Sequence, residues 1–67
     1  MKVTVNFWYN KRKLDAQLFD LNDFGTIGSF ENYMDDMLGG YRNGNGGTNW
    51  TIARADKKKA EDFFALD

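Results

Sequence analysis

The sequence predicts a small α+β domain, in which an antiparallel sheet (a hairpin plus a third strand) carries two packed helices in the order ββαβα. Three observations support this prediction. Apolar and polar residues alternate near the start of the chain, apolar residues recur with a helical period in its middle, and its length of 67 residues suits one domain. We therefore expect residues 1–67 to fold as a single domain.

The first two strands are predicted to form a hairpin. Residues 3–9 alternate between apolar and mostly polar side chains, which is typical of a half-buried strand. The polar run Asn10–Lys13 suits a hairpin loop, and residues 14–19 alternate in the same way. Closing the hairpin there makes one face wholly apolar, with Tyr9 opposite Leu14, Phe7 opposite Ala16 and Val5 opposite Leu18.

Two aromatic residues, Trp8 and Phe19, fall on the second face of this predicted hairpin. They are either covered by the C-terminal helix through Phe63 and Phe64 or exposed as a patch that anchors a partner. A domain this small buries only about 60% of the surface that its unfolded chain exposes, so it needs most of its apolar area inside. We therefore expect the C-terminal helix to cover both rings.

The first helix is predicted from Phe30 to Leu38. Ser29 is the expected N-cap, and the apolar residues that follow recur at the spacing of an amphipathic helix with one buried stripe: Phe30, Tyr33, Met34, Met37 and Leu38. Gly39-Gly40 should end the helix, because glycine tolerates the conformations found at helix ends.

A third strand and a second helix follow a glycine-rich connector. The strand is predicted over Asn49–Arg54, with Trp50 and Ile52 on one side. Asp56 is the expected N-cap of the last helix, whose apolar face consists of Ala60, Phe63 and Phe64.

Composition narrows the classes of function. The chain has no cysteine and no histidine, which excludes disulfides, the common soft-ligand metal sites and the usual nucleophilic triads. We expect no enzyme activity and no cofactor. The six Phe, three Tyr and two Trp should form the core, or else the protein associates as a homodimer.

Membrane association is not expected. A membrane-spanning helix needs about 20 apolar residues, and no segment approaches that length. The N-terminus lacks a signal-peptide pattern, so we expect a cytoplasmic protein without a membrane partner.

Charge is distributed unevenly along the chain. The net charge is −1, yet the segment from Leu14 to Leu38 has six acidic residues and no Lys or Arg. One interpretation is a solvated helix face that keeps the protein soluble. The other is an acidic surface that complements an Arg- and Lys-rich groove, such as the nucleic-acid channel of a nuclease.

Residues 20–31 resemble the calcium-binding loop of an EF-hand. Aspartate stands first, asparagine third, glycine sixth and glutamate twelfth, as in that loop. Phe24 occupies the fifth position and has no oxygen ligand to offer. The resemblance implies a degenerate calcium site as an alternative function, with Asp20, Asn22 and Glu31 as its ligands.

A small nucleic-acid-binding protein is a further alternative. Lys11–Lys13 lies next to Trp8 and Tyr9, a combination that single-strand binders use for phosphate contact and base stacking. The isoelectric point of about 5.2 argues against direct nucleic-acid binding.

The segment Leu18-Phe19-Asp20-Leu21-Asn22-Asp23-Phe24, followed by an acidic amphipathic helix, resembles the start of antirestriction proteins of the ArdA type. In that family a strand ending in a similar W-L-D-L-x-D-Y segment precedes an acidic helix. As a class, short cofactor-free chains with an acidic block also resemble phage-encoded inhibitors of restriction or CRISPR systems. The resemblance implies a viral or mobile-element inhibitor whose partner is a host nuclease or CRISPR effector.

Together these patterns predict a non-enzymatic protein-binding module that docks its acidic helix on a basic site of a host nucleic-acid-processing enzyme. Four acids would steer the encounter and three aromatic residues would anchor it: Asp23, Glu31, Asp35, Asp36, Trp8, Tyr41 and Trp50.

Overall fold

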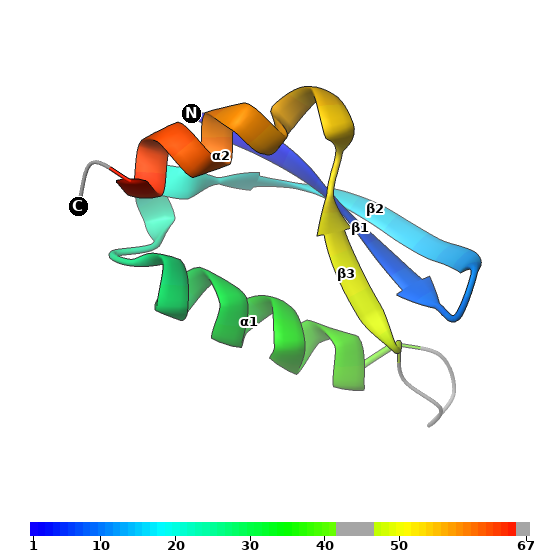
Figure 1. Cartoon of the computed structure of the whole chain (residues 1–67). Helices are drawn as coiled ribbons and strands as arrows, with labels where there is room; N and C mark the ends of the chain where they lie inside the picture. Colours follow the sequence, from blue (N-terminus) through cyan, green and yellow to red (C-terminus); the bar gives the residue numbers. More distant parts are fainter. Residues whose placement is uncertain (42–46, 66–67) are drawn as a thin grey trace.

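The computed structural model describes residues 1–41 and 47–65. Its elements confirm the predicted α+β class and the order ββαβα (Figure 1). They are the strands β1 (Lys2–Tyr9), β2 (Arg12–Asp20) and β3 (Asn49–Ile52), the helices α1 (Ile27–Gly39) and α2 (Arg54–Ala65), and a short 3-10 helix η1 (Leu21–Asp23). The three strands form one antiparallel sheet in the order β2-β1-β3. Neither helix has the length and apolar character that a bilayer crossing requires in the part of the chain described.

The core lies between one face of the sheet and the helices. The alternation of β1 is confirmed, because Val3, Val5 and Phe7 are fully buried on this inner face. Phe30 and Met34 of α1 bury their side chains against them, and so do Leu21, Leu38 and Ala60. The expected aromatic core is confirmed in part, since all six Phe with Tyr41 and Trp50 belong to this cluster or pack against it, whereas Trp8, Tyr9 and Tyr33 do not.

The predicted register of the hairpin is wrong, by two residues next to the turn and by one residue beyond the bulge. Tyr9 pairs with Arg12 across a two-residue turn, in which Asn10 adopts a left-handed φ of 55°. Asparagine tolerates that conformation better than most residues do. A bulge between Phe7 and Trp8 then shifts the pairing once more, so Phe7 lies opposite Asp15, Val5 opposite Gln17 and Val3 opposite Phe19.

This shift exchanges the two faces of β2, because successive side chains of a strand point in opposite directions. Leu18, expected inside, is 61% exposed and pairs with Thr4 on the outer face of the sheet. Phe19, expected outside, packs edge-on against Phe7 at a ring-centroid distance of 6.3 Å. The larger aromatic side chain thus contributes to the core in place of the smaller leucine.

The expectation that the C-terminal helix covers both Trp8 and Phe19 is also wrong. Phe19 is on the inner face, whereas the indole N–H of Trp8 donates to Thr51 Oγ1 of β3 at 2.9 Å. The helix α2 turns its apolar side toward α1, with the rings of Phe64 and Phe30 5.7 Å apart.

Both predicted helix caps need correction. Thr26 caps α1, since its hydroxyl accepts the backbone N–H of Ser29 at 3.1 Å. Thr and Ser are both good N-caps, and a cap at Thr26 instead of Ser29 places Ile27 in the first turn of the helix. Asp56 lies inside α2, and its carboxylate accepts the backbone N–H of Thr4 at 2.9 Å.

The position of α2 follows from the shortness of β3. The strand β3 pairs with Val5–Trp8 only, and beyond it Ala53 N–H donates to the carbonyl of Thr4 at 2.9 Å. Together with the bond from Thr4 N–H to Asp56, this contact holds the start of α2 beside the first half of β1. The two helices therefore lie apart, with β3 running from the start of α2 toward the end of α1 (Figure 1).

Candidate functional site

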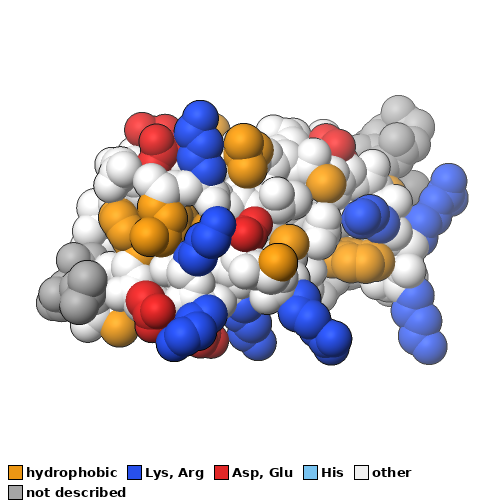
Figure 2. Space-filling model, turned by 90° about the horizontal axis from the view of Figure 1, so that it is seen from above, with side chains coloured by type: hydrophobic (Ala, Val, Ile, Leu, Met, Phe, Trp, Pro, Cys, Tyr) orange, Lys and Arg blue, Asp and Glu red, His pale blue; other side chains and the backbone are white. Residues whose placement is uncertain are grey.

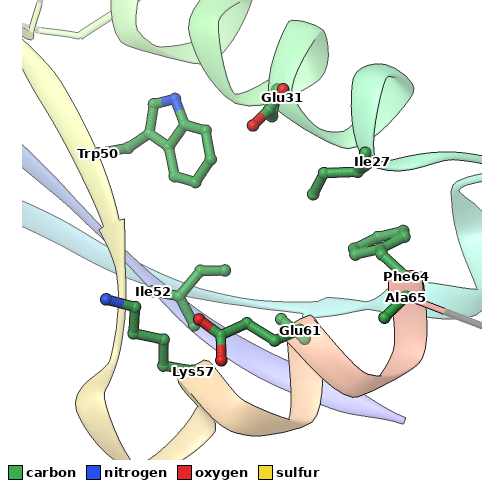
Figure 3. A pocket seen from close by; sticks show the side chains of 9 residues that line it. Ile27, Glu31, Trp50, Ile52, Lys57, Glu61, Phe64 and Ala65 are labelled. Carbon is green, nitrogen blue, oxygen red and sulfur yellow. The ribbon is translucent and has the colours of Figure 1, made fainter.

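An open groove lies between α1 and α2, with β3 along its end (Figure 3). Its volume is about 430 Å³, within the range of about 300–1,000 Å³ that ligand sites occupy. Three of its lining residues are charged, namely Glu31 on α1 and Lys57 and Glu61 on α2. The others are apolar: Ile27, Trp50, Ile52, Ala60, Phe64 and Ala65.

Trp50 is held in place at the β3 end of the groove. Its ring meets the buried ring of Phe30 edge-on, with centroids 5.7 Å apart. Its indole N–H donates to the carboxylate of Asp35 at 2.9 Å. These two contacts fix the indole between β3 and α1, so one predicted anchor and one predicted acid lie side by side.

The exposed side of α1 is acidic. Glu31, Asp35 and Asp36 are all exposed, and α1 has no Lys or Arg. Glu31 and Asp35 are one turn apart on the flank that faces the groove. Asp36 lies about 100° further around the helix and points away from the groove. The ion pairs within the described residues involve Asp20, Asp56 and Asp62, so none of them neutralises an acid of α1.

The opposite side of the molecule has a different charge. On the face seen in Figure 2, Lys and Arg side chains gather at one end and along one edge, and acidic and apolar side chains lie among them. The basic residues of the hairpin turn and of α2 account for this difference from the α1 side. The chain is therefore nearly neutral as a whole, with an acidic α1 side and an opposite side on which basic and acidic side chains are mixed.

The three predicted aromatic anchors are not brought together. Trp50 borders the groove, whereas Trp8 lies on the outer face of the sheet. Tyr41 packs on Phe7 of the core, with ring centroids 4.9 Å apart. The predicted acid Asp23 is exposed in η1, ahead of α1.

The hydroxyl of Tyr41 belongs to a polar cluster with β2. It donates to the carboxylate of Asp15 at 3.1 Å and accepts from the side-chain amide of Gln17 at 2.6 Å. Burial raises the pKa of Tyr41, and the neighbouring Asp15 carboxylate raises it further. The pKa of Asp15 is lowered, chiefly by the backbone N–H of Ala16 and then by the Gln17 and Tyr41 donors. This cluster fastens the segment after α1 to the sheet.

Several groove residues were missed at the level of sequence. Ile27 is 43% exposed at the mouth of the groove, and Lys57 and Glu61 form the opposite rim. The spacing of Ile27, Phe30 and Met34 extends the apolar stripe of α1 by one turn, so it could have identified Ile27 as part of the helix. Placing the cap at Ser29 left Ile27 outside the predicted helix. Tyr33, assigned to the buried stripe, is 51% exposed on the other flank of α1.

The residues of the calcium alternative serve other contacts. The Asp20 carboxylate accepts the backbone N–H of Asn22 at 3.0 Å and lies 3.4 Å from the terminal ammonium. The Asn22 bond is the largest cause of the lowered pKa of Asp20. Glu31 faces the groove instead. Over residues 1–41 and 47–65, no group of three or more acidic side chains is placed to hold a metal ion.

Comparison with protein-family models, with curated proteins and with solved structures finds no match to this chain. By its fold and its groove, the chain is a small α+β domain with an apolar groove beside an acidic helix.

Proposed function

We propose that this chain is a non-enzymatic protein-binding module that docks the acidic side of α1, together with the adjoining groove, on a basic surface of a partner protein. The observation that carries the proposal is the juxtaposition of an open apolar groove with exposed carboxylates that have no ion-pair partner among the described residues.

This juxtaposition has the anatomy of a protein interface. Such interfaces have an apolar centre that excludes water and a polar rim that sets orientation and encounter rate. Here Trp50 and Ile27 lie toward the centre, Glu31 and Asp35 flank it, and Asp36 extends the acidic surface over the exposed side of α1. Aromatic residues that are rigidly held are frequent hot spots, because little conformational entropy is lost when they bind.

The partner that fits best is a protein with an Arg- and Lys-rich channel for nucleic acid. Carboxylates on α1 would occupy positions that phosphates take in such a channel, and long-range attraction would speed association at low salt. The resemblance to antirestriction proteins and the small size of the chain support a phage-type inhibitor of a host nuclease or CRISPR effector, acting in the host cytoplasm. This identification of the partner is part of the proposal.

A pair of matched charge reversals tests the proposal. Asp36→Lys changes the acidic side of α1, whereas Asp62→Lys makes the same change in net charge on the exposed side of α2. Tagged native protein and both variants are used for affinity capture from a bacterial lysate. We expect native protein and Asp62→Lys to retain the same nucleic-acid enzyme, with DNA competing for it, and Asp36→Lys to lose it.

Salt provides the second readout of the same experiment. Retention by native protein should fall as salt is raised, because screening weakens attraction between exposed charges. Equal retention by both variants at low salt would contradict the proposal and leave the carboxylates of α1 as a solubilising surface.

A further inference from the structure

We infer that the groove between α1 and α2 receives a large apolar side chain of the partner, next to an arginine or lysine that pairs with Glu31. This inference rests on the proposed function, since it specifies what the docking surface recognises.

The lining of the groove favours an apolar occupant. Ile52 and Phe64 are only half-buried, and Ile27 is 43% exposed. Figure 3 shows these side chains converging from β3, α2 and α1 on the same space. Filling that space with an aromatic or long aliphatic side chain would remove apolar surface of both proteins from water.

Trp50 cannot turn to fill the groove without breaking its own contacts. The Asp35 carboxylate holds its indole N–H at 2.9 Å, and the ring of Phe30 packs against its edge. The groove is therefore open in the free domain and is preorganised for a partner.

The charges on the two rims determine on which side of the groove a cationic side chain of the occupant binds. Lys57 and Glu61 on α2 bring one positive and one negative charge to their rim, so that rim has no net charge, although the two form no ion pair among the described residues. Glu31 stands on the other rim with no ion-pair partner among the described residues, and Asp35 one turn away adds to its negative field. A cationic side chain is therefore favoured on the α1 side of the apolar one.

The occupant belongs to the basic partner, because the unpaired carboxylates of Glu31 and Asp35 complement a cationic side chain beside the apolar one. The hairpin turn of the protein itself has Tyr9 near Lys11 and Arg12, so a second copy is the competing occupant. Analytical ultracentrifugation of the full chain separates the two. Concentration-dependent association that Ile27→Asp abolishes would assign the groove to a second copy and would overturn the inference.

The direct test uses short peptide probes on the isotopically labelled full chain. The sequence has two tryptophans, so their indole N–H groups give separate nuclear magnetic resonance signals for the groove and for the outer face. The probe is acetyl-Gly-Arg-Phe-Gly-amide, with one control in which alanine replaces phenylalanine and one in which glutamate replaces arginine. We expect the probe to shift the Trp50 signal and to leave the Trp8 signal in place.

The controls set the expected magnitudes. Losing the aromatic ring should weaken binding by about tenfold or more, from the value of burying such a side chain. Replacing arginine by glutamate should weaken it by roughly two- to fivefold, which is typical of an exposed ion pair. An unchanged Trp50 signal, or equal binding of the alanine or glutamate peptide, would overturn the inference.

Two exposed aliphatic residues provide matched variants. Ile27→Asp should abolish the response to the probe, whereas Leu18→Asp on the outer face should leave it unchanged. If peptides fail to bind while Asp36→Lys still removes the captured partner, only the assignment of the groove is wrong. If neither experiment gives the expected result, the proposed function fails as well.

Discussion

The inner and outer faces of the sheet differ although β1 supplies the centre of both. On the inner face, Val3, Val5 and Phe7 are fully buried beneath the helices. On the outer face, Thr4 and Trp8 are only half-buried, and Leu18 on β2 is exposed. Stability is therefore concentrated on the inner face, and truncating an apolar side chain should cost far more there than on the outer face.

The largest expected difference is between Phe7→Ala and Leu18→Ala. Phe7 is fully buried against Tyr41 and Phe19, so truncation should lower the free energy of unfolding by about 3–5 kcal/mol. Leu18→Ala should cost about 0.5 kcal/mol or less, as for most exposed positions. Urea unfolding of both variants measures the difference. Comparable losses of unfolding free energy in the two variants would instead support the hairpin register that places Leu18 inside.

A second contrast concerns Gly47 and Gly39. A Cβ added at Gly47 would lie 2.5 Å from Leu38 Cδ2 of α1 and 3.0 Å from the carbonyl oxygen of Trp8, whereas one added at Gly39 meets nothing within 4 Å. Gly47→Ala should therefore destabilise the domain by about 1–3 kcal/mol, as overpacking does. Gly39→Ala should be neutral or stabilising by up to about 1 kcal/mol, because it lies at the end of a helix. Thermal melts of the pair would show whether Gly47 packs this closely on Leu38 of α1 and on the backbone of Trp8 in β1.

The attachment of α2 to β1 gives a smaller effect. Asp56→Ala leaves the part-buried backbone N–H of Thr4 without its acceptor, which should cost about 1–3 kcal/mol. Asp62→Ala removes only an exposed ion pair with Lys58 and should cost about 0.5 kcal/mol or less. Equal denaturant midpoints for the two variants would show that the carboxylate of Asp56 does not hold α2 in place.

The polar cluster of Asp15 and Tyr41 should make stability depend on pH at both extremes. The pKa of Asp15 is lowered from 3.8, so its contribution is present above that pH and is lost as the pH falls below it. The pKa of Tyr41 is raised from 10.0, so its contribution is present below that pH and is lost as the pH rises through the higher folded value.

An ultraviolet titration of tyrosine ionisation measures the alkaline half of this prediction. Tyr41 should ionise above pH 10.0, and Asp15→Asn should lower its pKa toward that value. Identical titrations of the native and Asp15→Asn chains would show that the Asp15 carboxylate does not interact with the Tyr41 hydroxyl.

The sequence predicted the fold class and β1 well because the alternation in β1 has only one reasonable assignment. In β2 both sets of alternate residues include large apolar side chains, Leu14 and Leu18 in one and Phe19 in the other. Periodicity alone therefore could not choose between them. A tight turn at Asn10 and a bulge decided the register, and both depend on pairing across the hairpin.

The acidic character of α1 could be predicted from composition along the chain, but the groove could not. Its lining residues come from three elements, and Trp50 meets Asp35 only after β3 has paired with β1. Thr26 and Ser29, three residues apart, were both chemically suitable caps, and choosing the second hid the contribution of Ile27.

The most direct test of the account is to map, on the labelled full chain, which backbone signals change when the captured partner is added. The account predicts changes along α1 and around the groove, at Ile27, Glu31 and Asp36, with little change at Leu18 and Thr51 on the outer face of the sheet. Changes confined to the outer face and the hairpin turn, with α1 unaffected, would contradict it.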